Sequence, residues 1–137
     1  MANETEIVLE YSNFAAIGAQ MAREIDVVCE STAEEIGARA ALAIQNPPKS
    51  GRIYRHGNVL HQASAPGEAP ASDTGALATN VTVNHDGPSD WSTTWNEEYA
   101  PDLEYGTPTI LPRPFARPAV EAVKERFMSA IRRIVGE

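Results

Sequence analysis

The sequence predicts an α+β domain with a long N-terminal helix, an antiparallel β-sheet with a central hairpin, and a C-terminal helix packed on the sheet. Three observations lead to this fold class: a helical apolar period in the first third of the chain, alternation of apolar and polar residues over residues 81–95, and a second helical stripe after residue 118. With 137 residues, we expect one domain over residues 1–137.

The N-terminal helix is predicted from apolar residues at three- and four-residue steps between Ser12 and Ala43. Ser12 or Asn13 is a suitable N-cap, and Asn46 with the two prolines after it ends the helix. The run "STAE" at Ser31 resembles a capping box, so a break into two helices near Ser31 stays open. The apolar positions are Phe14, Ile17, Met21, Ile25, Val28 and Ile36.

The middle of the chain combines short β-prone pieces with a loop. Residues 53–60 predict a hairpin or two short strands, interrupted by Gly57. The stretch "HQASAPGEAPASDTGAL" is rich in proline, glycine and alanine, so much of it should be neither helix nor strand. At its end "SDTGALA" predicts a helical turn capped by Ser72 or Asp73.

The strongest β signal is "NVTVNHDGPSDWSTTWNE", which predicts an antiparallel hairpin with its turn in "HDGPSD", where Asp86-Gly87 is a turn dipeptide. The next segment, "EEYAPDLEYGTP", predicts a short helix stopped by Gly106. A final helix should open at Pro118, with arginines in its last turn. We expect four residues to share one core cluster between hairpin and final helix: Trp91, Trp95, Phe127 and Ile131.

Composition limits the function classes. The net charge of −8 argues against a general phosphate-binding surface, although an acidic wall would let DNA pass without adhering. The single cysteine, Cys29, forms no intramolecular disulfide and indicates a buried structural thiol in a reducing cytoplasm. The sequence offers neither a membrane-spanning run nor the basic start of a signal peptide, so we expect no membrane association.

Candidate chemistry is sparse. The spacing of His56, His61 and His85 matches no metal-ligand pattern, so we expect no metal, cofactor or catalytic residue; a small metal-dependent hydrolase using these histidines remains the alternative from a different class. A second cluster, most simply a solvated acidic face, comprises Glu97, Glu98, Asp102 and Glu104. Phe115 is expected to be a core or interface anchor, with Arg113 and Arg117 as partners of the acids.

Four segments occur in a characteristic order: "SGRIYRHG", "HQASAPGEAPASDTGALA", "YAPDLEYGT" and "RPFARPA". Together they resemble the phage neck and minor tail (tail completion) protein family typified by the tenth gene product of phage HK ninety-seven. The resemblance covers about residues 49–121. The motif positions are Asp73, Thr74, Gly75, Leu77, Tyr99, Ala100, Leu103, Glu104, Gly106, Thr107, Arg113, Pro114, Phe115, Arg117 and Pro118.

The resemblance implies a structural, non-catalytic virion protein at the head–tail junction of a long-tailed phage, assembled in the host cytoplasm. It implies a ring of identical copies around the DNA channel, with a hexamer favoured and a dodecamer as the alternative, between head-completion or connector proteins and tail proteins. A tail terminator or head-closure protein of the same junction is the near alternative. We expect an interaction loop that is extended or poorly ordered in the isolated subunit and docks on a neighbour: Ala63, Ser64, Ala65, Pro66, Gly67, Glu68, Ala69, Pro70 and Ala71.

Overall fold

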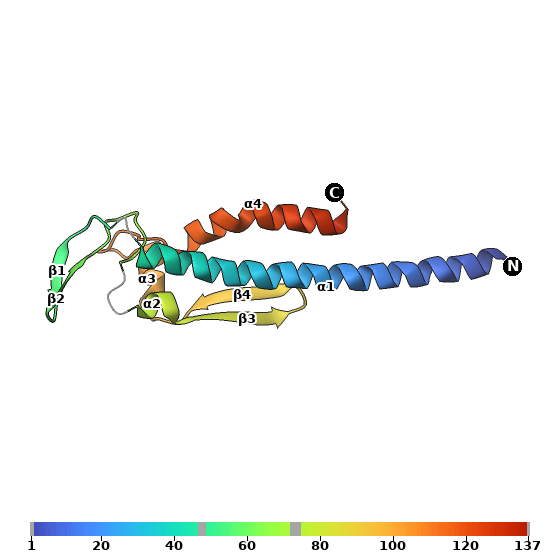
Figure 1. Ribbon diagram of the computed structural model, residues 1–137, viewed down its shortest axis with the longest axis horizontal. Coiled ribbons are helices and arrows are strands. Elements are labelled where there is room, and N and C mark those ends of the chain that lie inside the picture. Colours follow the sequence, from blue (N-terminus) through green and yellow to red (C-terminus); the bar gives the residue numbers. More distant parts are fainter. Residues whose placement is uncertain (1, 47–48, 72–74, 137) are drawn as a thin grey trace.

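The computed structural model describes residues 2–46, 49–71 and 75–136, without the side chains of residues 2–15, His56 and Val59. It is a mixed helix and sheet fold organised along one long helix, α1 (Ala2–Gln45). Helix α4 (Ala116–Val135) runs along one side of α1, and the hairpin of β3 (Val81–Gly87) and β4 (Asp90–Trp95) runs along another side (Figure 1). The predicted fold class is therefore confirmed.

Helix α1 is continuous over its 44 residues and begins ahead of the predicted caps at Ser12 and Asn13. The break left open near Ser31 is absent, because the hydroxyls of Ser31 and Thr32 donate to the carbonyl oxygen of Val28 one turn earlier (3.2 and 2.7 Å). Those hydroxyls are thereby satisfied within the helix and do not cap a new one. The helix ends at Gln45, as predicted from the residues that follow it.

Both predicted hairpins form, and each is a separate two-stranded antiparallel sheet. The first pairs β1 (Ile53–His56) with β2 (Val59–Gln62) and projects from the end of the molecule opposite the N-terminus (Figure 1). In the second, Val81 pairs with Trp95 and Gly87 pairs with Asp90. The turn therefore lies at residues 88–89, within the predicted "HDGPSD" stretch but after the Asp86-Gly87 pair, which belongs to β3. Ser89 takes the positive φ of 55°.

The β3–β4 hairpin is fixed to α1 by polar contacts along one helix face. At the hairpin tip the carboxylate of Asp26 accepts hydrogen bonds from the Ser89 amide (2.9 Å) and the Trp91 indole (3.1 Å). Further along, the Thr93 hydroxyl donates to the Ala33 carbonyl (2.6 Å). Gly37 completes this face, since a Cβ there would stand 3.5 Å from side chains of both strands. Polar contacts thus fix the hairpin on this face of α1, and the space at Gly37 is that of ordinary van der Waals contact.

The core lies at the end of the molecule where α1 finishes, and most of its members are small. Ile44 is its largest fully buried side chain, and Phe115 is only 2% exposed. The ring of Trp95 meets that of Phe115 edge to face, with centroids 5.2 Å apart, which connects the hairpin to the start of α4. The cluster consists of Ala40, Ile44, Leu77, Ala78, Ala100, Phe115 and Ala119.

Two helix starts differ from the predictions. Helix α2 (Ala76–Thr79) has Gly75 as its N-cap, with φ of 81°, in place of Ser72 or Asp73, which lie outside the described residues together with Thr74. Helix α4 begins at Ala116, two residues before Pro118, with Phe115 at the N-cap position. Helix α3 (Ala100–Tyr105) and its Gly106 C-cap are confirmed, as are the arginines in the last turn of α4.

Candidate functional site

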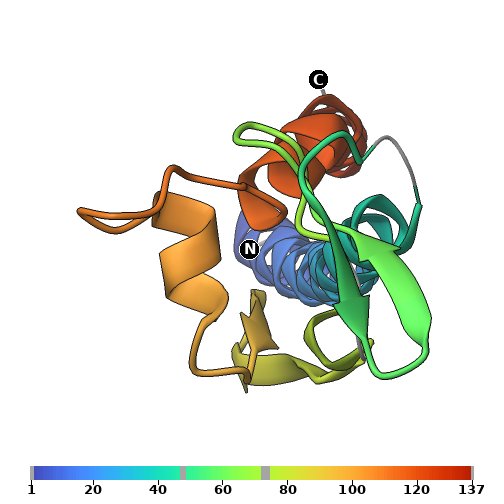
Figure 2. The same cartoon turned by 90° about the vertical axis from the view of Figure 1, so that its left-hand side faces the viewer.

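The segments that carry the family resemblance meet at one end of the molecule, which we call the motif junction (residues 49–71, 75–79 and 99–119 as described). Seen end-on, α3, the start of α4 and the loop after β2 surround the C-terminal end of α1 (Figure 2). Leu77, Ala100 and Phe115 are buried in the core there, and Leu103 packs against it. The motif residues therefore lie together in space although they are far apart in sequence.

Glu104 caps α4 from a different helix. Its Oε2 accepts the amides of Phe115 (2.8 Å) and Ala116 (2.9 Å), and its Oε1 accepts the amide of Arg117 (2.9 Å). These amides belong to the start of α4, where backbone donors have no partner inside the helix and the dipole favours an anion. The sequence placed Glu104 in a solvated acidic face, and its capping role was missed because the spacing of eleven residues matches no local capping motif.

The turn between α3 and α4 also depends on motif residues. Gly106 has a φ of 78°, and a Cβ there would stand 2.8 Å from the Ile110 carbonyl oxygen, so glycine is required. The Thr107 hydroxyl accepts the Ile110 amide (3.0 Å), and the Arg113 amide donates to the Leu103 carbonyl (2.6 Å). These bonds bring the chain back to the end of α3 and place Phe115 in the core.

The loop of residues 63–71 is held by its own glutamate. The Glu68 carboxylate accepts the amides of Ser50 (2.9 Å) and Ala65 (3.0 Å), and the Ser50 hydroxyl also donates to it. The Ser50 hydroxyl bond, followed by the two amide bonds, lowers the pKa of Glu68 below its ordinary value of 4.5. A charged carboxylate therefore closes this loop at neutral pH.

Other segments attach the same loop to the body of the protein. The Lys49 ammonium donates to the Ala43 and Ala69 carbonyls (2.8 and 2.7 Å), and the Gly67 amide donates to the Pro112 carbonyl (3.0 Å). The Arg113 guanidinium donates to the carbonyl of Ser64 (3.2 Å), and Ser64 is only 4% exposed.

The loop of residues 63–71 is therefore tethered within the subunit at several points, and its docking on a neighbour stays a prediction. Bonds from residues 49–50 and 112–113 replace the apolar burial that the loop sequence lacks. Other predicted site residues lie nearer the surface or at a helix start. Pro66, Arg117 and Pro118 are exposed, Tyr99 is the N-cap of α3, and Pro114 is half-buried beside Phe115.

A second feature is an apolar cleft of about 420 Å³ between β4, α1 and α4. Trp91, Trp95 and Phe127 line it together, so three of the four residues predicted to share a core cluster do converge. They surround an open cleft, Trp95 also packs against the core cluster, and Ile131 lies outside the lining. Lys124 stands at the α4 wall. The volume of the cleft is in the range of clefts that bind ligands or side chains of a partner.

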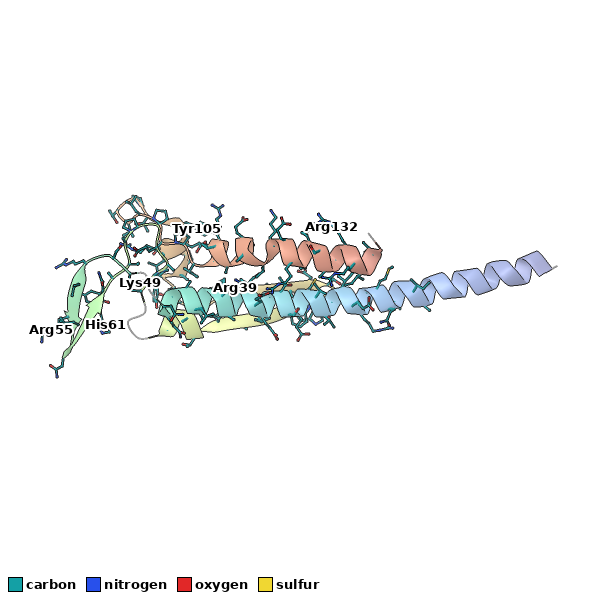
Figure 3. The ribbon with its side chains drawn as sticks, turned by 45° about the horizontal axis from the view of Figure 1, so that its top comes forward. Arg39, Lys49, Arg55, His61, Tyr105 and Arg132 are labelled. Carbon is teal, nitrogen blue, oxygen red and sulfur yellow. The ribbon has the colours of Figure 1, made fainter. Side chains whose placement is uncertain are left out.

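The histidines do not come together. His61 lies on β2 in the hairpin that projects from the molecule (Figure 3), with Tyr54 stacked against it. His85 lies on β3 in the other hairpin and stacks on Trp91 with ring centroids 4.3 Å apart. His85 Nε2 is 3.4 Å from Asp26, and hydrogen bonds from Trp91 and Ser89 lower the pKa of that carboxyl. The side chain of His56 lies outside the description.

Within the described ranges, no three histidine, cysteine, aspartate or glutamate side chains are placed to hold one metal ion. Cys29 lines the apolar cleft, and burial raises the pKa of its thiol, which disfavours the reactive thiolate. Among the described helices, none is both long and apolar enough to cross a membrane.

The comparisons with known proteins add no relative from which function can be transferred. Neither a family model, nor a curated protein, nor a solved structure matches this chain.

Proposed function

We propose that this chain is a structural subunit of a ring at the head–tail junction of a long-tailed phage, where copies of it join or complete neck and tail around the DNA channel. The ordered series of motif segments supports the phage role through the resemblance described above. The single structural observation that supports an assembly is the large surface of the isolated subunit.

The accessible surface of the chain is 9362 Å². A compact monomer of 14.8 kDa has an accessible surface of about 7,000 Å². The excess is on the order of 2,400 Å². A subunit in a ring has two neighbours and buries about 800 Å² against each in a standard interface. Two such interfaces would bury about 1,600 Å², which is about two thirds of the excess surface.

Charge favours the same role. A ring of chains that each carry −8 presents a strongly acidic assembly, which repels the phosphate backbone of DNA in transit. The motif junction supports a structural role, because its residues cap α4 and tie the loop of residues 63–71 to the rest of the subunit. These features support the proposed location in the virion, and a tail terminator or head-closure protein would occupy the same junction.

The test removes the gene for this chain from a phage that encodes it and examines the lysate by electron microscopy. We expect filled heads and tails that are not joined, or tails of abnormal end structure, and recovery of joined particles when the chain is supplied from a plasmid. A triple variant with glutamine at His56, His61 and His85 should restore particles as well as the wild type. Normal particles without the chain, or failure of the histidine variant with stoichiometric bound zinc in the wild type, would favour the hydrolase alternative.

A further inference from the structure

The first turns of α1 form an arm, residues 2–19, that extends past the C-terminal end of α4 and past the β3–β4 hairpin (Figure 1). Ile134, near the end of α4, lines a pocket together with residues of α1, and Gln20 is the first of these residues in the chain. The arm lies before this pocket. Residues 16–19 are exposed, and the Ile17 side chain is 51% exposed. A helix projecting into water is marginal on its own, because most helical stability in proteins comes from packing.

The arm sequence has the pattern of a helix that packs on another helix. Ile7, Tyr11 and Phe14 follow one another at four- and three-residue steps, the spacing of a single helical face. Glu4 and Glu10 fall on either side of that face by the same spacing. With three glutamates and no lysine or arginine, the arm has a formal charge of −3.

Helix α4 carries an exposed apolar stripe beside the cleft. Val120, Met128 and Val135 are 43%, 39% and 46% exposed, and Phe127 is half-buried at the cleft wall. At helical spacing these residues fall on one face together with Ile131, next to the face that packs on α1.

The charge of α4 is opposite to that of the arm. Five basic residues against two acidic ones give residues 116–135 a net charge of +3. Arg117 and Lys124 lie on or beside the apolar stripe by helical spacing, and both side chains are exposed. Arg132 extends from the side of α4 turned away from α1 (Figure 3).

We propose that the arm of one copy packs in the cleft and along the α4 stripe of a second copy, in a head-to-tail contact. The two elements match in apolar pattern, in charge and in length, since the arm is about 27 Å long and the stripe from Val120 to Val135 about 24 Å. Because arm and stripe are different surfaces, the contact is heterologous and repeats from copy to copy until a ring closes. This inference deepens the proposed function by stating how the copies contact one another.

The test uses purified full-length chains and light scattering, so its outcome is independent of any role in a virion. One variant is altered in the arm (Ile7→Asp with Phe14→Asp) and another in the stripe (Val120→Asp with Met128→Asp). We expect an oligomer for the wild type, a monomer for each variant alone, and a complex of two chains when the variants are mixed. The mixture should stop at two because only one intact arm and one intact stripe remain.

Leu42→Asp is the matched control, since Leu42 is an exposed apolar residue (57%) at the other end of α1. It should leave the oligomer unchanged, and circular dichroism should show native helicity for every variant. A second pair tests charge: Glu4→Lys with Glu10→Lys, and Arg117→Glu with Lys124→Glu, should each weaken association, and all four together should restore it. A monomeric wild type, oligomeric single variants, or a mixture that stays monomeric would overturn the proposal.

Discussion

The two ends of this molecule use their residues differently. At the motif junction, Glu104, Glu68 and Arg113 are engaged in contacts within the subunit. At the opposite end, the arm of α1 extends beyond the elements described around it (Figure 1). The motif junction is thus rich in internal contacts, whereas the arm is the element proposed to contact a second copy. Mutations at the two ends should accordingly have different effects, on folding at the junction and on assembly at the arm.

The largest effect on folding is expected for Phe115→Ala. Phe115 is 2% exposed and connects α4, the core and Trp95, so its truncation should lower the free energy of unfolding by about 3–5 kcal/mol. Phe127→Ala is the matched control on the same helix, because Phe127 lines an open cleft. Chemical denaturation measures both. Equal losses at the two positions would show that the core is not concentrated at the junction.

The next effect concerns the cap on α4. Glu104→Ala removes three charge-assisted hydrogen bonds to backbone amides and should cost about 1–3 kcal/mol of unfolding free energy. Glu98→Ala removes the same charge from an exposed position just before α3 and should cost less than about 0.5 kcal/mol. If both variants unfold at the same denaturant concentration, the carboxylate of Glu104 does not stabilise α4.

A smaller and local effect is expected from acid. The pKa of Glu68 is lowered in the folded protein, so its contribution to stability is complete above 4.5, the ordinary value, and is lost as the pH falls through the folded value. Hydrogen exchange should show the Ser50 and Ala65 amides less protected in Glu68→Gln at neutral pH, with the gap to the wild type closing below pH 4.5. A gap that persists in acid would mean that the loop is held without this carboxylate.

The sequence predicted the elements whose signals are local. The period of α1, the alternation in β3 and β4, and the Gly106 stop after α3 all act within a few residues. The structure differs from the prediction where a distant group decides the geometry. Helix α4 starts early because Glu104 caps it from α3, and the hairpin turn sits at residues 88–89 with Asp26 of α1 bonded to Ser89.

The site was predictable only in part, for the same reason. The motif residues were identified, but their roles depend on which segments meet. The loop of residues 63–71 lacks apolar side chains, and its tethers come from Lys49 and Arg113, which spacing alone does not connect to it. These tethers within the subunit were therefore beyond what local sequence determines.

The smallest effect is expected at two glycines of α1, of which one lies beside the β3–β4 hairpin and the other lies in the arm. Gly37 packs under the β3–β4 hairpin, and an added Cβ would be 3.5 Å from Thr93 and Val81, an ordinary van der Waals distance. Gly18 lies in the arm, where an added Cβ would meet nothing within 4 Å. Alanine favours a helix interior over glycine by up to about 1 kcal/mol at either position. Gly37→Ala should therefore raise the free energy of global unfolding by up to that amount. In the monomeric stripe variant (Val120→Asp with Met128→Asp), Gly18→Ala should increase the helical circular dichroism and leave the denaturation midpoint unchanged, because the free arm frays separately from the core. A midpoint that rises equally in both variants would show that the arm unfolds together with the rest of α1, and the division of the molecule into two regions would be wrong.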